Sequence, residues 1–241
     1  MNKKTVTKVA VFRFSIVFFT VICYNTVNGN DWTGFVNDFF KRYEELIVCR
    51  ESMEKGVEMM CDTYKKGGKI LVCGNGGSCA DSEHIVGELM KSFVLPREIP
   101  QCDKDKFKAL LGDESDLFNK NLQRGIPAFS LSSQTGVMTA YNNDVDSDMV
   151  YAQLLYASAR ENDLFIGIST SGNSKNVVNA VKTAKAIGIK SLCLTGAKTC
   201  VIDEFADCVI KVPETETYKI QELHLPVYHY LCLKTEKILF G

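Results

Sequence analysis

The chain reads Ile70-Leu71-Val72-Cys73-Gly74-Asn75-Gly76-Gly77-Ser78 where a short apolar run passes into a glycine-rich polar turn. The run is typical of a buried β-strand, and a helix is predicted over residues 78–93. The glycines let a ligand approach the backbone closely, and the helix start beyond them presents N–H groups and a positive dipole end. The turn lacks both the Lys-Ser/Thr of a P-loop and the three spaced glycines of a dinucleotide site. An ordinary strand-to-helix turn therefore explains it equally well.

A second polar turn gives a stronger signal, because it carries four hydroxyl groups. Ser169, Thr170, Ser171 and Ser174 follow the apolar run Leu164–Ile168 and precede another predicted helix. Hydroxyls together with helix-start amides suit a phosphate monoester better than a base or a flat ring. Ser174 is the expected N-cap of the helix, which gives one of the four hydroxyls a structural explanation.

Strand-like and helix-like segments alternate along most of the chain. Apolar runs at 70–73, 128–132, 163–169, 191–195 and 208–212 predict strands. Three- and four-residue periodicity predicts helices over 31–64, 78–93, 135–141, 149–159 and 176–187, and from residue 219 onward. This order predicts an α/β fold with a mostly parallel sheet covered on both faces. In such sheets ligands bind beyond the carboxyl ends of the strands, where both polar turns fall.

Two segments lie outside this alternation. Residues 97–125 are highly charged and are interpreted as an insertion in a single domain, 31–241, with one helix over 116–123. The insertion is either a solvated excursion or a lid over the site. Residues 1–30 have a basic start and an apolar run of about secretory-signal length. They fit a signal or anchor, a β-prone extension, or an added upstream start, and the last two are preferred.

Composition narrows the function classes. A net charge of −1 provides no basic field, so nucleic acid is not an expected partner. No membrane partner is expected either, because the N-terminal apolar run is too short to span a bilayer comfortably. The 10 cysteines are scattered without C-x-x-C spacing, and Cys73, Cys193 and Cys208 lie in apolar runs. Buried thiols in a reduced, cytoplasmic protein are therefore expected.

Imidazole and carboxyl groups gather in two distant segments. His84 and Glu88 are four residues apart, on one face of a predicted helix and offset from its apolar stripe. They form either a solvated ion pair or part of a site. Gln221, His224 and His229 lie in the last helix, and this set of side chains suits a borderline metal. Gln221 and His229 are roughly 12 Å apart along an ideal helix, a gap that a kink at the intervening proline, residue 226, would shorten.

These motifs together resemble the SIS (sugar isomerase) domain family, in its sedoheptulose 7-phosphate isomerase branch. The resemblance runs from about residue 33 to the end, apart from the insertion. Its motifs are Cys73-Gly74-Asn75-Gly76-Gly77-Ser78, His84-x-x-x-Glu88, Asn142-Asn143-Asp144, Gly167-Ile168-Ser169-Thr170-Ser171-Gly172-Asn173-Ser174 and Gln221-Glu222-x-His224-x-x-x-x-His229. It implies a three-layer, doubly wound sandwich with a five-stranded parallel sheet, preceded by N-terminal helices. It also implies a homotetramer with active sites at subunit interfaces and one zinc ion per subunit.

The resemblance also implies a role for each matching residue. Glu88 and His229 would be the acid/base pair of a ketose–aldose isomerisation that proceeds through an enediol. The metal ligands would be His84, Glu88, Gln221 and His229. The phosphosugar would contact the two polar turns, the Asn-Asp pair and the last helix, through Asn75, Gly76, Gly77, Ser78, Asn143, Asp144, Ser169, Thr170, Ser171, Ser174 and Gln221.

Two other functions remain open on the resemblance. Some relatives are non-catalytic and bind a sugar phosphate or a protein partner, as the replication-initiator-binding type does. A sugar-phosphate-sensing module is the other alternative, but no helix-turn-helix accompanies the domain. Because Glu88 and His229 are both present, the isomerase is favoured. The insertion, the N-terminal extension and the residues just before His229 differ from typical heptose enzymes and leave the exact sugar open.

Overall fold

The computed structural model describes residues 32–241, so the expectations for residues 1–30 lie outside the described part. The chain divides into two compact units. The first ends at Glu44 and also includes Gly241, and the second spans Glu45–Phe240. In the first unit, helix α2 (Trp32–Arg42) is followed by Tyr43, whose ring lies 5.1 Å from that of Phe39.

A five-stranded parallel sheet forms the centre of the second unit. Its strands are β1 (Ile70–Gly74), β2 (Ala128–Ser130), β3 (Leu164–Ile168), β4 (Lys190–Thr195) and β5 (Cys208–Lys211). Their order is β2-β1-β3-β4-β5, and every neighbouring pair is parallel. All residues of β1 and β3 are buried, as expected of strands covered on both faces. The predicted α/β fold with a five-stranded parallel sheet is therefore confirmed.

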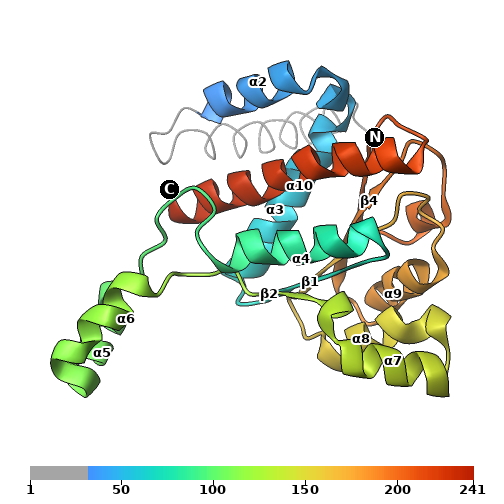
Figure 1. Ribbon diagram of the computed structural model, residues 1–241. Helices are drawn as coiled ribbons and strands as arrows, with labels where there is room; N and C mark the ends of the chain where they lie inside the picture. The colour runs from blue at the N-terminus through green and yellow to red at the C-terminus, as the bar shows by residue number, and fades with distance from the viewer. Residues whose placement is uncertain (1–31) are drawn as a thin grey trace, which may run out of the picture. The chain divides into compact units, whose positions relative to one another are not determined.

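Helices cover both faces of the sheet (Figure 1). They are α3 (Arg50–Lys65), α4 (Gly77–Met90), α7 (Thr135–Asp144), α8 (Val150–Ser158), α9 (Lys175–Ala186) and α10 (Thr217–Phe240). Successive side chains of a strand point to opposite faces of the sheet, so their contacts show which helices cover each face. Leu192 of β4 lies against Gly56 of α3, as does Leu231 of α10. The next residue, Cys193, belongs to the core cluster that includes α8 and α9.

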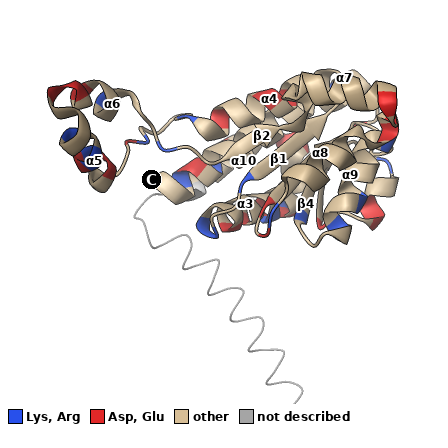
Figure 2. Ribbon diagram, turned by 90° about the horizontal axis from the view of Figure 1, so that it is seen from below, with Lys and Arg blue, Asp and Glu red and all other residues tan. Residues whose placement is uncertain are grey.

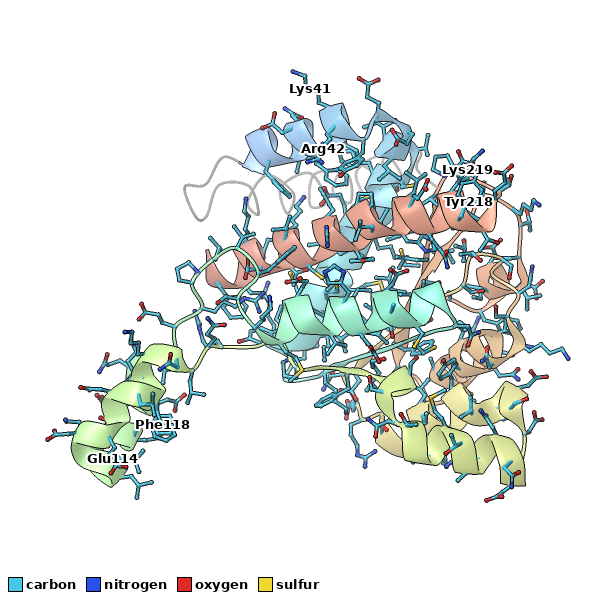
Figure 3. The ribbon with its side chains drawn as sticks, viewed as in Figure 1. Lys41, Arg42, Glu114, Phe118, Tyr218 and Lys219 are labelled. Carbon is cyan, nitrogen blue, oxygen red and sulfur yellow. The ribbon has the colours of Figure 1, made fainter. Side chains whose placement is uncertain are left out.

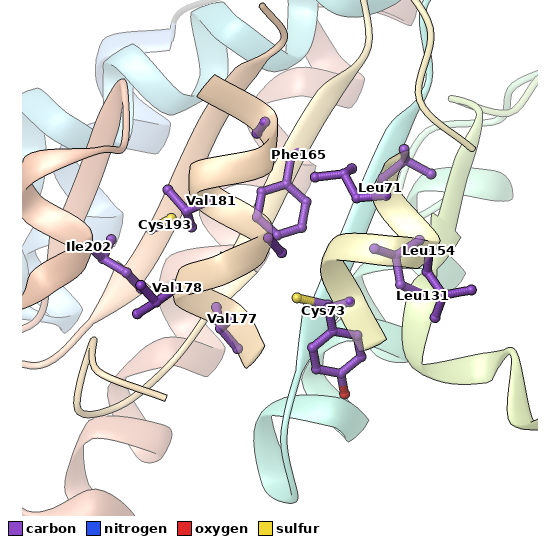
Figure 4. Packing of buried hydrophobic residues seen from close by; sticks show 14 of the residues in the cluster. Leu71, Cys73, Leu131, Leu154, Phe165, Val177, Val178, Val181, Cys193 and Ile202 are labelled. Atoms are coloured by element: carbon purple, nitrogen blue, oxygen red, sulfur yellow. The ribbon is translucent and has the colours of Figure 1, made fainter. Parts of the chain in front are cut away.

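That core cluster fills the space between the sheet and helices α8 and α9 (Figure 4). Leu71, Phe165 and Cys193 reach into it from three neighbouring strands, and Leu154 and Val181 meet them from the helices. Each of these five side chains is at most 6% exposed. The cluster holds β1 and β3 rigidly beneath the two polar turns, which start where these strands end.

The three cysteines predicted to lie in apolar strands are buried. Cys73, Cys193 and Cys208 are buried and free, and burial raises the pKa of each thiol. Such thiols act as small apolar groups in the core and are poor nucleophiles.

The insertion contains two helices, so the prediction of a single one was wrong. Helix α5 (Gln101–Leu111) and α6 (Ser115–Asn121) form a hairpin that lies away from the sheet in both ribbon views (Figures 1 and 2). The rings of Phe107 and Phe118 stack between its two helices, with their centroids 5.4 Å apart. Phe118 is labelled in Figure 3. Its acidic and basic residues are interspersed, and α5 has no buried residue. Hydrophobic periodicity is weak in a helix of this kind, which is why α5 escaped prediction.

Helix α10 continues through Pro226, so the proline does not end the helix. Pro226 and His224 are both buried. Among residues 32–241, none of the helices has the length and apolar character needed to cross a bilayer.

Candidate functional site

The two polar turns meet at the carboxyl edge of the sheet. Strands β1 and β3 are paired so that Gly74 lies opposite Ile168, which places the following turns side by side. Asn75 of the first turn and Asn176 in the first turn of α9 exchange two side-chain hydrogen bonds, 2.8 and 2.9 Å long. Asn176 was not among the predicted site residues. Its position two residues after Ser174, the predicted N-cap, was the sequence signal that could have placed it near the turn.

The hydroxyl-rich turn is held in one shape by contacts of its own. Gly172 has φ +64°, and a Cβ there would lie 2.2 Å from Cys200 Sγ, so only glycine fits. Ser169 Oγ donates to Ser174 Oγ at 3.1 Å, and Ser171 Oγ accepts from the backbone N–H of Asn173 at 3.2 Å. These contacts gather the hydroxyls at the start of α9.

Ser174 is the N-cap residue of α9, as expected, but its side chain makes no capping hydrogen bond. Its hydroxyl faces Ser169 instead. The structural explanation offered for this hydroxyl is therefore wrong. The N–H of Val177 in the first turn of this helix is bonded to Asn176 Oδ1 at 3.0 Å. The helix start, with its dipole and the cluster of hydroxyls beside it, is well suited to an anion.

Helices α4 and α10 run parallel and side by side, so the two distant segments of polar residues do converge (Figure 1). At their N-terminal ends, Gln221 lies over Gly77, where a Cβ would be 2.6 Å from Gln221 Nε2. Two turns later, the rings of His84 and His229 are 5.1 Å apart and nearly perpendicular. Gln221 and His229 thus contact α4 at two different levels.

Glu88 and His84 form a direct pair on α4. His84 Nε2 lies 3.1 Å from Glu88 Oε1, and Lys91 Nζ lies 3.0 Å from Glu88 Oε2. The side chain of Glu88 is 13% exposed, compared with 43% for His84. The carboxylate of Glu88 is thus mostly buried while its partner His84 is partly exposed, and it places an acidic group near both His84 and His229.

His84 is also bonded on its other side. Its Nδ1 lies 2.9 Å from the hydroxyl of Tyr228, which donates to Asp81 Oδ1 at 3.4 Å. Burial raises the pKa of Asp81 against the opposing effects of Tyr228 and His84, and burial with the nearby Asp81 charge raises that of Tyr228. Asp81 and Tyr228 were not predicted. The available signals were the three-residue spacing of Asp81 from His84 and the position of Tyr228 next to His229.

His229 sits in a partly apolar niche. Its ring lies 5.5 Å from Phe93 and 5.1 Å from Tyr228. Its Nε2 is buried and, within the described residues, has no hydrogen-bond partner. Burial, and then the proximity of His84, lowers its pKa, whereas Glu88 opposes the shift. A neutral imidazole with a free ring nitrogen is able to exchange a proton or bind a metal.

This arrangement supplies only part of a metal-binding site. The described residues contain no group of three or more His, Cys, Asp or Glu side chains placed to hold one. The imidazole nitrogens of His84 and His229 and the carboxylate of Glu88 are nevertheless types of ligand that zinc binds, and Nε2 of His229 has no partner among the described residues. Gln221 lies two turns away at Gly77.

The remaining predicted residues are dispersed around this centre. Gly76 has φ +57° and precedes Ser78, which is 3% exposed and bonded through its N–H to Asn75 O. Thr170 accepts from the N–H of Gly196 through its carbonyl. Asn143 and Asp144 are exposed at the end of α7 and bond to each other at 2.8 Å. The contacts of these last two with a sugar stay a prediction.

His224, the third histidine, belongs to the core. It is fully buried, its Nε2 lies 3.4 Å from the carbonyl of Thr195, and its Nδ1 has no partner in the described part of the chain. Burial lowers its pKa to about 4, so the folded protein holds it neutral.

Comparison with known proteins identifies the family of the chain. Two SIS domain models match the chain, one over residues 138–231 and the other over 32–100. Residues 101–137, which contain α5 and α6, fall outside both matches. The phosphoheptose isomerase of Aneurinibacillus thermoaerophilus is 33% identical over 85% of this chain and 96% of its own length. The phosphoheptose isomerase of Aliarcobacter butzleri is 37% identical over 83% of this chain and 94% of its own length.

Solved structures support the same assignment. The phosphoheptose isomerase of Neisseria gonorrhoeae superposes with a TM-score of 0.65 at 28% identity, over 85% of this chain and 96% of that one. A phosphoheptose isomerase from Francisella tularensis superposes with a TM-score of 0.67 at 23% identity, over 85% of this chain and 98% of that one. This second match supports the fold. With its parallel sheet, paired polar turns and His84–Glu88–His229 cluster, the chain belongs to the SIS domain family, in the phosphoheptose isomerase branch.

Proposed function

We propose that the protein is a phosphosugar ketose–aldose isomerase that converts sedoheptulose 7-phosphate to a heptose 7-phosphate. The observation that carries this proposal is the meeting of Glu88 and His229 around His84, from two helices more than a hundred residues apart in sequence. A carboxylate and a neutral imidazole at one site are the groups that a proton transfer between adjacent carbons needs.

The phosphate is proposed to bind at the start of α9. Ser169, Thr170, Ser171 and Ser174 supply hydroxyl groups there, and the helix start supplies a favourable dipole and backbone N–H groups. The sugar would then extend across Asn75, Gly76 and Gly77 toward Gln221. A phosphate fixed at one end leaves the carbonyl end of the sugar to be placed beside the acid/base pair.

In the proposed reaction, one member of the Glu88–His229 pair removes a proton from carbon 1, next to the ketose carbonyl at carbon 2. The electron pair left behind forms the double bond of an enediol as the carbonyl oxygen takes up a proton. A proton is then delivered to carbon 2, the hydroxyl on carbon 1 loses its own, and an aldehyde results. The lowered pKa of His229 keeps its imidazole available as an acceptor near neutral pH.

Zinc is proposed as the resident metal, one per subunit, with His84, Glu88 and His229 as ligands. The family resemblance adds Gln221, which in this structure lies two turns away at Gly77 and would have to approach the ion by a movement of α10 or α4. When bound, it would polarise the carbonyl and stabilise the negative charge that develops on its oxygen. The support is the donor chemistry and the unpartnered Nε2 of His229. Metal analysis of purified protein, with His84→Ala as the comparison, tests this part separately from turnover.

A homotetramer with active sites at subunit interfaces is proposed as the working form. Its support is the family resemblance together with exposed apolar side chains on several elements. Val48 is 71% exposed and Leu225, on α10 beside the site, 41%. Light scattering of the purified protein decides the number of subunits.

The experiment that tests the function is NMR of the protein incubated with sedoheptulose 7-phosphate, with and without a chelator. Appearance of aldose signals is expected from the wild type. Binding without any aldose would favour a non-catalytic SIS protein, which has no need of Glu88 and His229.

A further inference from the structure

A fully buried ion pair lies directly behind the proposed site. Arg97 Nε and Glu236 Oε1 are 2.6 Å apart, and neither side chain is exposed at all. Burial by itself raises the pKa of Glu236, but hydrogen bonds from three backbone N–H groups and from Arg97 outweigh it and leave the pKa lowered. Charged side chains are rarely buried this completely unless they are fully bonded, so the contacts of the pair indicate its role.

The guanidinium of Arg97 holds the end of helix α4. Nη1 donates to the carbonyl of Leu89 at 2.6 Å, and Nη2 donates to the carbonyl of Glu88 at 3.1 Å. These carbonyls belong to the last turn of α4, where backbone acceptors have no partner within the helix and a cation is favourable. The main chain of Glu88 is therefore held directly by Arg97.

The carboxylate of Glu236 holds the segment that follows α4. It accepts the backbone N–H groups of Phe93, Val94 and Leu95 at 2.8, 2.9 and 3.1 Å. The ring of Phe93 in turn packs against His229, 5.5 Å away. His229 and Glu236 are seven residues apart on α10, which places them two turns apart on the same face.

One buried pair thus connects the backbones that carry Glu88 and His229. We propose that Arg97 and Glu236 are positioning residues that set the separation of the proposed acid/base pair. Arg97 fixes the last turn of α4, and Glu236 fixes both the Phe93 segment and its own position on α10. Misplacement of a reacting group by about 1 Å costs about a hundredfold in rate, so rigid support at this point governs turnover.

This inference rests on the proposed function, and its test separates positioning from plain structural support. Arg97→Lys keeps the positive charge beside Glu236 but loses the planar fork that reaches both carbonyls. We expect kcat to fall about tenfold to a hundredfold, with KM within about twofold of wild type, at a temperature where the variant is fully folded. A variant that is merely less stable would instead lose kcat only in proportion to its unfolded fraction.

Glu54→Gln is the matched control. Glu54 of α3 is ion-paired with Lys234, two residues before Glu236 on the same helix but directed toward α3. This variant is expected to lower the unfolding midpoint and to leave kcat of the folded protein unchanged. If Arg97→Lys does not fold, Glu236→Gln, which keeps the shape and removes the charge, is measured in the same way.

The outcomes are distinct. Wild-type kcat in fully folded Arg97→Lys, or an equal loss of kcat in the Glu54→Gln control, overturns the positioning role. Activity in Glu88→Gln overturns the proposed function itself, because the group being positioned would then have no part in the reaction. An inactive Glu88→Gln, a slow Arg97→Lys with normal KM and an unimpaired Glu54→Gln together support the inference.

Discussion

His84 Nδ1 lies 2.9 Å from the hydroxyl of Tyr228, which places one ring nitrogen of His84 against α10 and the other against Glu88. The Tyr228 hydroxyl also donates to Asp81, so its oxygen is left to accept a hydrogen bond from the N–H of His84 Nδ1. Such a partner behind an imidazole commonly fixes the tautomer and orientation of a metal-binding histidine.

Tyr228→Phe removes this hydroxyl and keeps the ring packing. We expect zinc affinity to fall about tenfold to a hundredfold. The free energy of unfolding should drop by about 1–3 kcal/mol, because His84 Nδ1 and Asp81 lose a partner. Chelator competition and urea unfolding measure the two effects. Tyr230→Phe is the control, since Tyr230 is a buried tyrosine of the same helix whose hydroxyl bonds to Glu54 instead. Equal zinc affinity in the two variants would argue against any role of Tyr228.

Glu88→Gln should abolish turnover and leave the fold intact. The amide keeps the size of the side chain but cannot take up a proton, and loss of a general base typically costs about 10²–10⁴ in rate. Steady-state turnover and circular dichroism check the two parts. Glu83→Gln, an exposed change on the same helix, serves as the control. Near-normal activity of Glu88→Gln would remove Glu88 from the mechanism.

Ser171→Ala combined with Ser174→Ala should raise KM for the phosphorylated sugar and change kcat little. Each hydrogen bond to a charged phosphate contributes about 1.5–3 kcal/mol, so the double variant should bind at least about tenfold more weakly. Thr183→Ala, farther along α9, is the control and should behave as wild type. An unchanged KM in the double variant would place the phosphate elsewhere.

His224 should make the fold sensitive to acid. Its pKa in the folded state is about 4, below the usual 6.5, so between these values the unfolded chain binds a proton that the folded chain does not. Above pH 6.5 the free energy of unfolding is not reduced by protonation of His224. As the pH drops toward 4, the free energy of unfolding falls by about 3 kcal/mol in total, because the unfolded chain takes up this proton first. Urea unfolding at several pH values measures the slope. His224→Gln should flatten it relative to wild type, and an unchanged slope would contradict the assignment.

Much of the fold was predictable because its signals are local. The apolar runs that end at Cys73 and Ile168 are each followed by glycine and hydroxyl residues, and both became buried strands with turns at one edge of the sheet. The i, i+4 spacing of His84 and Glu88 likewise predicts a shared helix face, and the side chains do touch.

Other features depend on contacts that no local pattern reveals. Arg97 and Glu236 are 139 residues apart, and charged residues are expected at the surface, so their burial follows only from tertiary packing. Helix α5 has no buried face to impose periodicity. A proline usually disrupts a helix, yet α10 continues through Pro226, which is buried within it.

The most direct test of the central claim, that Glu88 and His229 move a proton between adjacent carbons of a phosphosugar, is NMR of sedoheptulose 7-phosphate turnover in D2O. An enediol whose proton exchanges with solvent predicts a heptose 7-phosphate that carries deuterium at carbon 2, formed by the wild type and not by Glu88→Gln. A wild-type protein that binds the sugar phosphate but forms no aldose, or a Glu88→Gln variant that forms it at the wild-type rate, would contradict the account.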